Sequence, residues 1–284
     1  MQSQLERFLI LWAKCTKLLD LSVNLKLKNM KEIMTNVFFR IWYWYVSKVD
    51  KESEITFMNY GFSKDNQEIE LDEKDKKNKY SAQLYHYVAN SIDIKGKDIL
   101  EVGCGRGGGL SYINRYLSPK TVTGLDLNQR AIKFCRKNYS TENSTFIEGN
   151  AQLLKFDNNS FDVIINVESS HRYNQINKFL NEVYRVLKPG GYFLFADFRL
   201  QNEVEKLNEQ LKNSNFKVLS NEIITVNVLE ALKLSSNETE NLIIKIAPKL
   251  LHSLGKKFAA TEGTPTFNKF ATNEFEYLFY VLTK

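Results

Sequence analysis

The stretch DILEVGCGRGGGLSY, residues 98–112, decides the fold of this chain. It places five glycines directly after a short apolar run, and Gly103, Gly105 and Gly108 form the pattern G-x-G-x-x-G. Such a pattern is typical of a tight turn between a buried strand and a helix, where backbone N–H groups and the helix N-terminus face a bound ligand. The pattern alone is a weak signal, so the flanking sequence has to identify the ligand.

Strands and helices alternate from residue 98 onward. The runs TVTGLDL (121–127), TFIEGN (145–150), FDVIINV (161–167) and YFLFADF (192–198) are typical of buried strands, and helical patterns separate most of them. This alternation predicts a doubly wound, Rossmann-like α/β fold. Residues 216–225 and FEYLFYVLT (275–283) add two further strands. We therefore expect a seven-stranded sheet whose last strand is antiparallel, unlike a plain dinucleotide-binding domain.

The sequence predicts four parts. Residues 1–95 form a helical N-terminal extension, 96–226 the ligand-binding core, 227–270 a helical lid over a second substrate, and 271–284 the last strand. The aromatic run NVFFRIWYWYV (36–46) contains Arg40 and is shorter than the roughly 20 apolar residues that span a bilayer. Packing in the core or lid is favoured for this run, and peripheral contact with a membrane surface stays open.

Composition excludes several classes of protein. The chain has 284 residues, 43% of them hydrophobic, and a net charge of +6. Its lysines alternate with acids, as in DEKDKKNKY (72–80), which indicates a solvated face and no nucleic-acid partner. Cys15, Cys104 and Cys135 show no C-x-x-C spacing, and no His/Asp/Glu cluster has ligand spacing, so we expect neither disulfides nor a metal. A cytoplasmic location is the default.

The residues around the glycines disfavour a pyrophosphate. Glu101 lies two positions before Gly103, and its carboxylate would repel a phosphate but attract an amine or sulfonium. Tyr184 and Lys188 form the Y-x-x-x-K pair of some dehydrogenases, yet the matching glycine loop is absent. An NAD-dependent oxidoreductase is therefore the less favoured alternative.

Four ordered motifs carry a resemblance to a known family. They are ILEVGCGRGGG (99–109), TGLDLN (123–128), EGNAQLLKFDNNSFDVIINVESSH (148–171) and EVYRVLKPGGYFLFADF (182–198). Together they resemble the class I S-adenosylmethionine-dependent methyltransferases over about residues 80–226. The runs VESSH (167–171) and FMNYGF (57–62) more narrowly resemble O-methyltransferases that tailor lipids and polyketides, such as the phthiotriolone and microcystin O-methyltransferases.

The resemblance implies S-adenosylmethionine as the cofactor. Glu101 would orient its amino group, and Asp126 would accept hydrogen bonds from its ribose, although Asp126 could instead cap the following helix. Asn150 stands where many relatives carry aspartate, and an amide also suits adenine. Phe57, Tyr60 and Phe62 would close over the cofactor or simply pack in the core. The implied cofactor-binding residues are Tyr60, Glu101, Gly103, Gly105, Asp126, Leu127, Asn150, Ala151 and Val167.

An alcohol has to lose a proton during methyl transfer, and histidine is suited to accept it. Of the histidines His86, His171 and His252, only His171 follows a strand of the predicted core. We expect His171 to be the general base, Glu168 to orient it, and Asp197 to be a second candidate acid or base.

The expected reaction is O-methylation of a hydroxyl on a small natural product. This polyketide, peptide or lipid acceptor would be apolar, and either free or bound to a carrier protein. C- or N-methylation in the same fold is the runner-up, and a fold that binds without catalysis is a further alternative. The oligomeric state stays open.

Overall fold

The computed structural model describes residue 50 and residues 54–64 and 69–284. The chain divides into two units, residues 1–51 and 52–284, and the second contains the sheet and the candidate site. The helices predicted within residues 1–48 and the aromatic run 36–46 lie outside the described residues. Among the helices that are described, none is both long and apolar enough to cross a bilayer.

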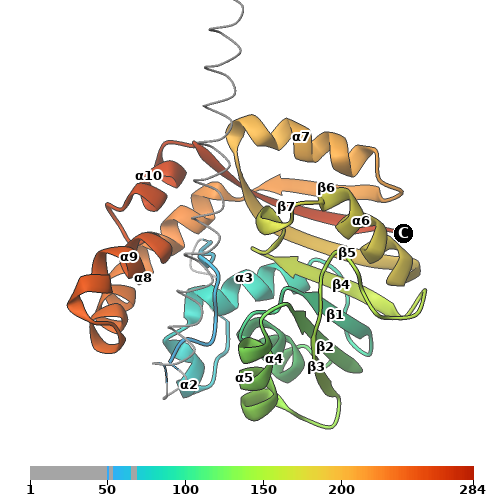
Figure 1. Cartoon of the computed structure of the whole chain (residues 1–284), viewed down its shortest axis with the longest axis horizontal. Coiled ribbons are helices and arrows are strands. Elements are labelled where there is room, and N and C mark those ends of the chain that lie inside the picture. The colour runs from blue at the N-terminus through green and yellow to red at the C-terminus, as the bar shows by residue number, and fades with distance from the viewer. Residues whose placement is uncertain (1–49, 51–53, 65–68) are drawn as a thin grey trace, which may run out of the picture. The chain divides into compact units, whose positions relative to one another are not determined.

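A seven-stranded sheet forms the centre of the second unit (Figure 1). Its strand order is β3-β2-β1-β4-β5-β7-β6, and β7 runs antiparallel to both of its neighbours. The remaining pairs are parallel, which confirms the predicted Rossmann-like sheet with an antiparallel last strand. The strands are β1 (Asp98–Val102), β2 (Thr121–Asp126), β3 (Ser144–Glu148), β4 (Phe161–Val167), β5 (Leu187–Leu200), β6 (Lys217–Ile223) and β7 (Phe275–Thr283).

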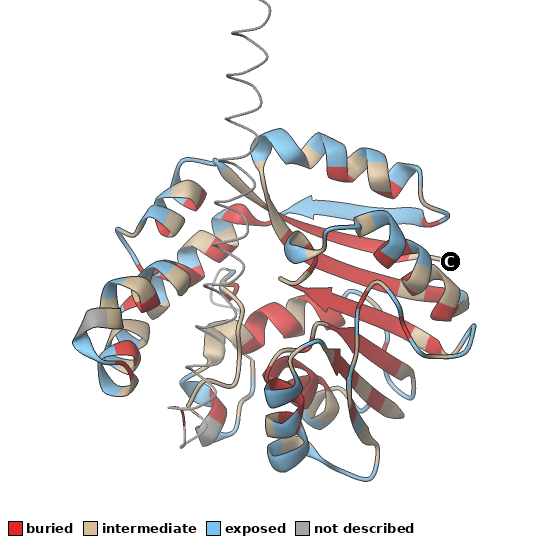
Figure 2. Ribbon diagram, in the orientation of Figure 1, coloured by how far each residue is buried: buried red, intermediate tan, exposed pale blue. Residues whose placement is uncertain are grey.

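Helices cover both faces of this sheet. One cluster of buried side chains joins a face of the sheet to α3, α4, α5, α8 and α10, and a second cluster joins the other face to α6 and α7. Figure 2 shows the central strands buried and the edge strand β6 exposed. The helices are α2 (Glu73–Lys76), α3 (Lys79–Ala89), α4 (Gly108–Tyr116), α5 (Gln129–Tyr139), α6 (Ile176–Val186), α7 (Gln201–Lys212), α8 (Thr225–Ile246), α9 (His252–Phe258) and α10 (Pro265–Ala271).

Strand β7 shows why both faces of the sheet are covered. Successive side chains of a strand point to opposite faces, so an apolar strand without polar alternation has to be buried on both. Tyr277 and Phe279 belong to the first cluster, whereas Leu278 and Tyr280 belong to the second. The run FEYLFYVLT therefore fits a central position in the sheet.

The elements from residue 98 onward occur in the predicted order, and the largest difference in a boundary lies between α6 and β5. The amphipathic run INKFLNEVYRVLK (176–188), followed by Pro189-Gly190-Gly191, predicts a helix that ends at Lys188. In the structure α6 ends at Val186, and β5 begins at Leu187. Leu187 already pairs with Phe161, and an irregularity separates that pair from the pairing of Val163 with Tyr192. The Pro189–Gly191 turn therefore lies inside the strand, because strand pairing begins before it.

The predicted lid corresponds to the helices between β6 and β7. These are α8, α9 and α10, and a 3-10 turn lies between α8 and α9. Helix α3, which belongs to the predicted N-terminal extension, packs into the first cluster through fully buried Leu84 and Val88. The four-part division of the chain stays a prediction.

Candidate active site

Four acidic side chains lie at the carboxyl ends of neighbouring strands. Glu101 is the penultimate residue of β1, and Asp126 is the last residue of β2. Glu168 directly follows β4, and Asp197 lies in the second half of β5. Because parallel strands end at one edge of a sheet, this edge is where ligands of doubly wound folds bind. The structure brings the predicted groups together there.

The turn after β1 requires glycine at position 103. Gly103 has a φ of +81°, and a Cβ at this position would lie 2.0 Å from Oγ of Ser169. Its N–H donates to the carbonyl of Leu125 at 2.7 Å, which ties the turn to β2. Gly105 also has a positive φ, +51°, but a Cβ there would approach only Sδ of Met58, at 3.6 Å. Gly103 thus meets two constraints, and Gly105 meets one.

Alanine substitutions should separate these two constraints. A left-handed backbone costs a non-glycine residue about 1–2 kcal/mol, and overpacking costs about 1–3 kcal/mol more. We expect Gly103→Ala to lower the free energy of unfolding by about 3 kcal/mol, and Gly105→Ala by about 1–2 kcal/mol. Urea unfolding of both variants measures the difference. Equal losses would contradict the steric role of Ser169.

The two carboxylate oxygens of Glu101 differ in their hydrogen bonding. It is 0% exposed, and its Oε1 accepts a hydrogen bond from the Tyr85 hydroxyl at 2.6 Å. Its Oε2 has no hydrogen-bond partner among the described residues. Burial raises the pKa of Glu101 to about 8, an effect that the Tyr85 hydrogen bond opposes and the charge of Asp126 reinforces. A buried acceptor of this kind is costly unless a ligand supplies a donor, which an amino group can do.

Asp126 is held by backbone donors on both oxygens. Oδ2 accepts from the N–H of Gly105 at 2.9 Å, and Oδ1 accepts from the N–H of Asn128 at 2.7 Å. Burial raises the pKa of Asp126. A carboxylate has about four acceptor positions, so both oxygens can still accept from hydroxyl groups. The capping role considered for Asp126 belongs to Asn128, whose side chain accepts from the N–H groups of Arg130 and Ala131.

Four further predicted cofactor residues lie at or just after the carboxyl ends of β2, β3 and β4. Leu127 is 73% exposed, and Asn150 is exposed with its Oδ1 accepting from the N–H of Gln152 at 2.9 Å. Ala151 and Val167 are buried. An exposed leucine next to a polar site offers an apolar surface to a flat ring. The cofactor contacts of these four residues stay predictions.

His171 and Asp197 form a hydrogen-bonded pair. His171 lies on the 3-10 turn Ser170–Arg172 after β4, with Nδ1 2.8 Å from Oδ1 of Asp197. The backbone N–H of His171 also donates to Oδ2 of Asp197, at 2.9 Å. A proton on Nδ1 leaves Nε2 as the basic atom of the ring. In this structure, Nε2 accepts from Nε of Arg172 at 3.2 Å.

Asp197 is an anion although it is 0% exposed. Burial raises its pKa, but the interactions with His171 and Arg199 outweigh burial and hold that pKa well below the usual carboxyl range. Nη1 of Arg199 lies 3.1 Å from Oδ2, and the Ser170 hydroxyl donates to the same oxygen at 2.7 Å. An ionised carboxylate so surrounded is suited to fix the tautomer and orientation of His171.

Glu168 contacts other groups than the one predicted for it. Its Oε1 accepts from the backbone N–H of Tyr60 at 2.8 Å and from the Tyr277 hydroxyl at 3.0 Å. Glu168 has a left-handed backbone, with a φ of +46°, and burial raises its pKa to about 8. The Glu168 carboxylate is thus engaged by donors from two other segments, and the carboxylate that contacts the His171 ring is Asp197.

An aromatic cluster adjoins His171. Tyr60, Phe198, Phe270 and Phe275 form it, and each touches at least two of the others, with ring centroids 5.1–5.7 Å apart. The His171 ring lies 4.5 Å from that of Phe198. The cluster combines the segment before α3, strand β5, helix α10 and strand β7. It gives the candidate base an apolar neighbour.

The other aromatic residues of FMNYGF lie in two different places. A Cβ at Gly108 would come within 3.1 Å of the Phe57 ring, so Phe57 lies beside the glycine turn. Phe62 is buried and stacks on Tyr87, with ring centroids 4.2 Å apart. Phe62 therefore packs in the core, which is the alternative considered for these rings, whereas Phe57 is placed beside the cofactor turn.

Sequence reasoning missed several residues of the site. Tyr85 lies on α3, outside every motif, and no local pattern marks its hydroxyl as a partner of Glu101. Arg199 could have been found, because residues i and i+2 of a strand share a face and Arg199 follows Asp197 by two positions. The hydroxyls of Ser169 and Tyr173, which are 2.7 Å apart, complete the wall next to Gly103.

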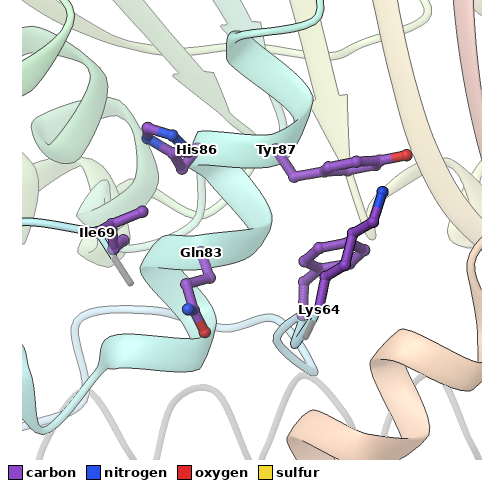
Figure 3. A pocket seen from close by; sticks show the side chains of 6 residues that line it. Lys64, Ile69, Gln83, His86 and Tyr87 are labelled. Carbon is purple, nitrogen blue, oxygen red and sulfur yellow. The ribbon is translucent and has the colours of Figure 1, made fainter. Parts of the chain in front are cut away.

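Neither a metal-binding cluster nor the detected pocket coincides with this site. Within the part of the chain that the structure describes, no group of three or more His, Cys, Asp or Glu side chains is arranged to hold a metal. A small pocket over α3, shown in Figure 3, includes Phe62 but none of the residues predicted for catalysis or for the bound cofactor's contacts at the strand ends. It is lined by Phe62, Lys64, Ile69, Gln83, His86 and Tyr87.

Comparison with known proteins gives the class. A methyltransferase domain family matches residues 100–195. The phthiotriol/phenolphthiotriol dimycocerosates methyltransferase of Mycobacterium tuberculosis is 38% identical over 254 residues, which are 88% of this chain and 94% of the relative. The chain belongs to the S-adenosylmethionine-dependent methyltransferases. Within that class it is also similar to the fatty-acid O-methyltransferase of Mycolicibacterium smegmatis, 38% identical over 85% of this chain and 88% of the relative.

A solved structure shows the same fold. The geranyl diphosphate C-methyltransferase of Streptomyces coelicolor, in complex with S-adenosyl-L-homocysteine, aligns with a TM-score of 0.60 at 15% identity. The alignment covers 85% of this chain and 94% of that one. The cofactor follows from the class: the relatives and the matching domain family make this chain an S-adenosylmethionine-dependent methyltransferase, and none of them supports the NAD-dependent alternative. Lys188 of the Y-x-x-x-K pair contacts Asp98, which begins β1, at the opposite end of that strand from the glycine turn.

Proposed function

We propose that this protein transfers a methyl group to a hydroxyl of an apolar, lipid-like small molecule, with His171 as the general base. The observation that carries the proposal is the His171–Asp197 pair, which lies against the aromatic cluster at the sheet edge that also carries Glu101 and Asp126. One group there is able to accept a proton, and the surface beside it is apolar.

The residues of this edge fit the cofactor. Oε2 of Glu101 lacks a hydrogen-bond donor within the described residues, and the amino group of the methionine moiety would supply one. Asp126 at the end of β2 would accept from the ribose hydroxyls, and Gly103 and Gly105 would let the backbone approach. When bound, S-adenosylmethionine supplies an electrophilic methyl group.

His171 would accept the proton of the acceptor hydroxyl. A neutral alcohol is a weak nucleophile, and a positioned base contributes about 10²–10⁴-fold to such a reaction. Asp197 would hold the proton on Nδ1 and leave Nε2 to act. The acceptor hydroxyl would take the position at Nε2 that Nε of Arg172 occupies in this structure.

The acceptor would lie against the aromatic cluster. Rings from the segment before α3 and from helix α10 both belong to it, so the predicted lid contributes to this wall through Phe270. The named substrates of the two mycobacterial relatives, phthiotriol dimycocerosates and fatty acids, are apolar. A lipid acceptor, free or presented by a carrier protein, is thus preferred to a peptide.

Methylation of a carboxyl group is the second candidate. It is favoured by the similarity to a fatty-acid O-methyltransferase. A carboxylate is already an anion and needs no base, so this reaction would not require His171. The two candidates therefore differ in their dependence on one side chain.

Mass spectrometry of three matched acceptors tests the proposal. The acceptors are a long-chain alcohol, a long-chain fatty acid of equal length, and a short polar alcohol, each incubated with enzyme and S-adenosylmethionine. We expect the long-chain alcohol to gain the mass of one methyl substitution and to yield an ether. Products from the fatty acid alone would establish the second candidate, and methylation at carbon or nitrogen alone would overturn both.

A further inference from the structure

Tyr85 connects helix α3 to the cofactor turn. Its hydroxyl donates to Oε1 of Glu101 at 2.6 Å, and both side chains are buried. Its ring lies against Gly109 in the first turn of α4, where a Cβ would be only 1.9 Å from Cζ of the ring. The glycine at position 109 thus makes room for this tyrosine. The missing side chain at Gly109 and the hydrogen bond to Glu101 together fix the position of the Tyr85 hydroxyl.

The same hydrogen bond makes the two carboxylate oxygens of Glu101 unequal. Oε1 is occupied by Tyr85, whereas Oε2 has no hydrogen-bond partner within the described residues. A carboxylate held at one oxygen has its other oxygen oriented before any ligand arrives, which reduces the ordering cost of binding. Tyr85 is therefore placed to prepare Glu101 for a cationic group.

We propose that Tyr85 is a positioning residue for cofactor binding, and that the amino group of the cofactor displaces a proton from the Glu101–Tyr85 pair when it binds. Before binding, burial raises the pKa of Glu101 and so favours its neutral form. The incoming ammonium requires the carboxylate form, so the carboxyl proton passes to solvent while Tyr85 keeps its own proton and its bond to Oε1. The proposal rests on Glu101 as the amino-group site and does not depend on the acceptor.

The groups around Glu101 agree with this proton balance. Burial and the nearby charge of Asp126 favour the neutral acid, and the Tyr85 hydrogen bond favours the anion. Burial raises the pKa of Tyr85 well above its ordinary value, so Tyr85 remains a donor throughout the neutral range. The other titratable groups that interact with this pair are Cys104 of the turn, Glu168 after β4 and Tyr277 of β7.

Calorimetry with the full chain and S-adenosylhomocysteine tests the proposal. Titrations at one pH in two buffers of different ionisation enthalpy report the protons released on binding. We expect release of about one proton at pH 7, and an affinity that rises up to about tenfold between pH 6 and pH 7. The comparison stays below about pH 8, where the ligand's own amine loses its proton.

Tyr85→Phe is the decisive variant, because it keeps the ring against Gly109 and removes only the hydroxyl. We expect its affinity for S-adenosylhomocysteine at pH 7 to fall about 10-fold, and the rise of affinity with pH to move to higher pH. The matched control is Tyr87→Phe, on the same helix, whose hydroxyl donates to Glu222. That control should bind like the wild type.

A ligand without an amino group separates positioning from packing. Methylthioadenosine lacks the amino-acid moiety, so Tyr85→Phe should not change its affinity, and its binding should release no proton. An equal loss for both ligands, or an unchanged pH profile in Tyr85→Phe, would overturn the role of Tyr85. Unchanged S-adenosylhomocysteine binding in Glu101→Gln would instead overturn the assignment of Glu101 itself.

Discussion

Replacing His171 with alanine should lower kcat for a hydroxyl acceptor by about 10²–10⁴-fold. The variant loses the atom proposed to accept the hydroxyl proton, while Glu101, Asp126 and the glycine turn are unchanged. The affinity for S-adenosylhomocysteine should therefore stay near that of the wild type. Steady-state kinetics with a long-chain alcohol, together with calorimetry, measure the two quantities separately.

Two controls make this result specific. His86→Ala removes an imidazole from α3, and the Nδ1 of His86 lies 2.7 Å from the Tyr112 hydroxyl. His86 does not belong to the His171–Asp197 pair, so this control should keep the wild-type kcat. Added imidazole, a replacement base, should restore part of the turnover of His171→Ala but not raise that of the wild type. If His171→Ala turns over the alcohol at the wild-type rate at neutral pH, His171 is not the base.

Asp197→Asn should lower kcat by a similar factor and also destabilise the fold. The amide cannot balance the charge of Arg199, whose side chain is 10% exposed, and it no longer accepts two charge-assisted hydrogen bonds. Removing one partner of a buried ion pair costs about 3–5 kcal/mol. The loss of kcat, about 10²–10⁴-fold, follows from the loss of the tautomer that leaves Nε2 basic.

Urea unfolding as a function of pH identifies the ion that is lost. The folded pKa of Asp197 lies below the value of about 3.9 in an unfolded chain, so its ionisation stabilises the fold above about pH 4 and this contribution disappears as the pH falls. Asp197→Asn should lack that part of the acid destabilisation. The control Asp162→Asn changes a carboxylate that pairs with Lys188 near the start of β4, and it should leave kcat unchanged. Equal kcat in wild type and Asp197→Asn would remove Asp197 from the mechanism.

The sequence predicted the sheet because its signals are local. Each strand of the core is a short apolar run followed by a turn or helix signal, as in DILEV before the glycines, so its type is readable without knowledge of the fold. The helix boundary at Val186 could not be read in the same way. It depends on the pairing of Leu187 with Phe161 in another strand, and proline and glycine suggested a later stop.

The site was predictable only to the extent that it follows strand ends. His171 and Asp197 were both identified by position, and their contact follows from the parallel pairing of β4 with β5. The partners of Glu168 were not predictable. Tyr60 and Tyr277 lie 108 and 109 residues away from it in the sequence, and only the completed fold brings them to one oxygen.

The shared oxygen of Glu168 has a consequence for how acceptor preference can diverge among relatives. The partner at position 60 is a backbone N–H, which every residue except proline provides, whereas the partner at position 277 is a tyrosine hydroxyl. The side chain at position 60 can therefore change, and reshape the aromatic cluster, without loss of the hydrogen bond that fixes its segment. At position 60 the side chain lies in the proposed acceptor surface and the backbone N–H holds the segment, so the two tasks fall to different atoms of one residue.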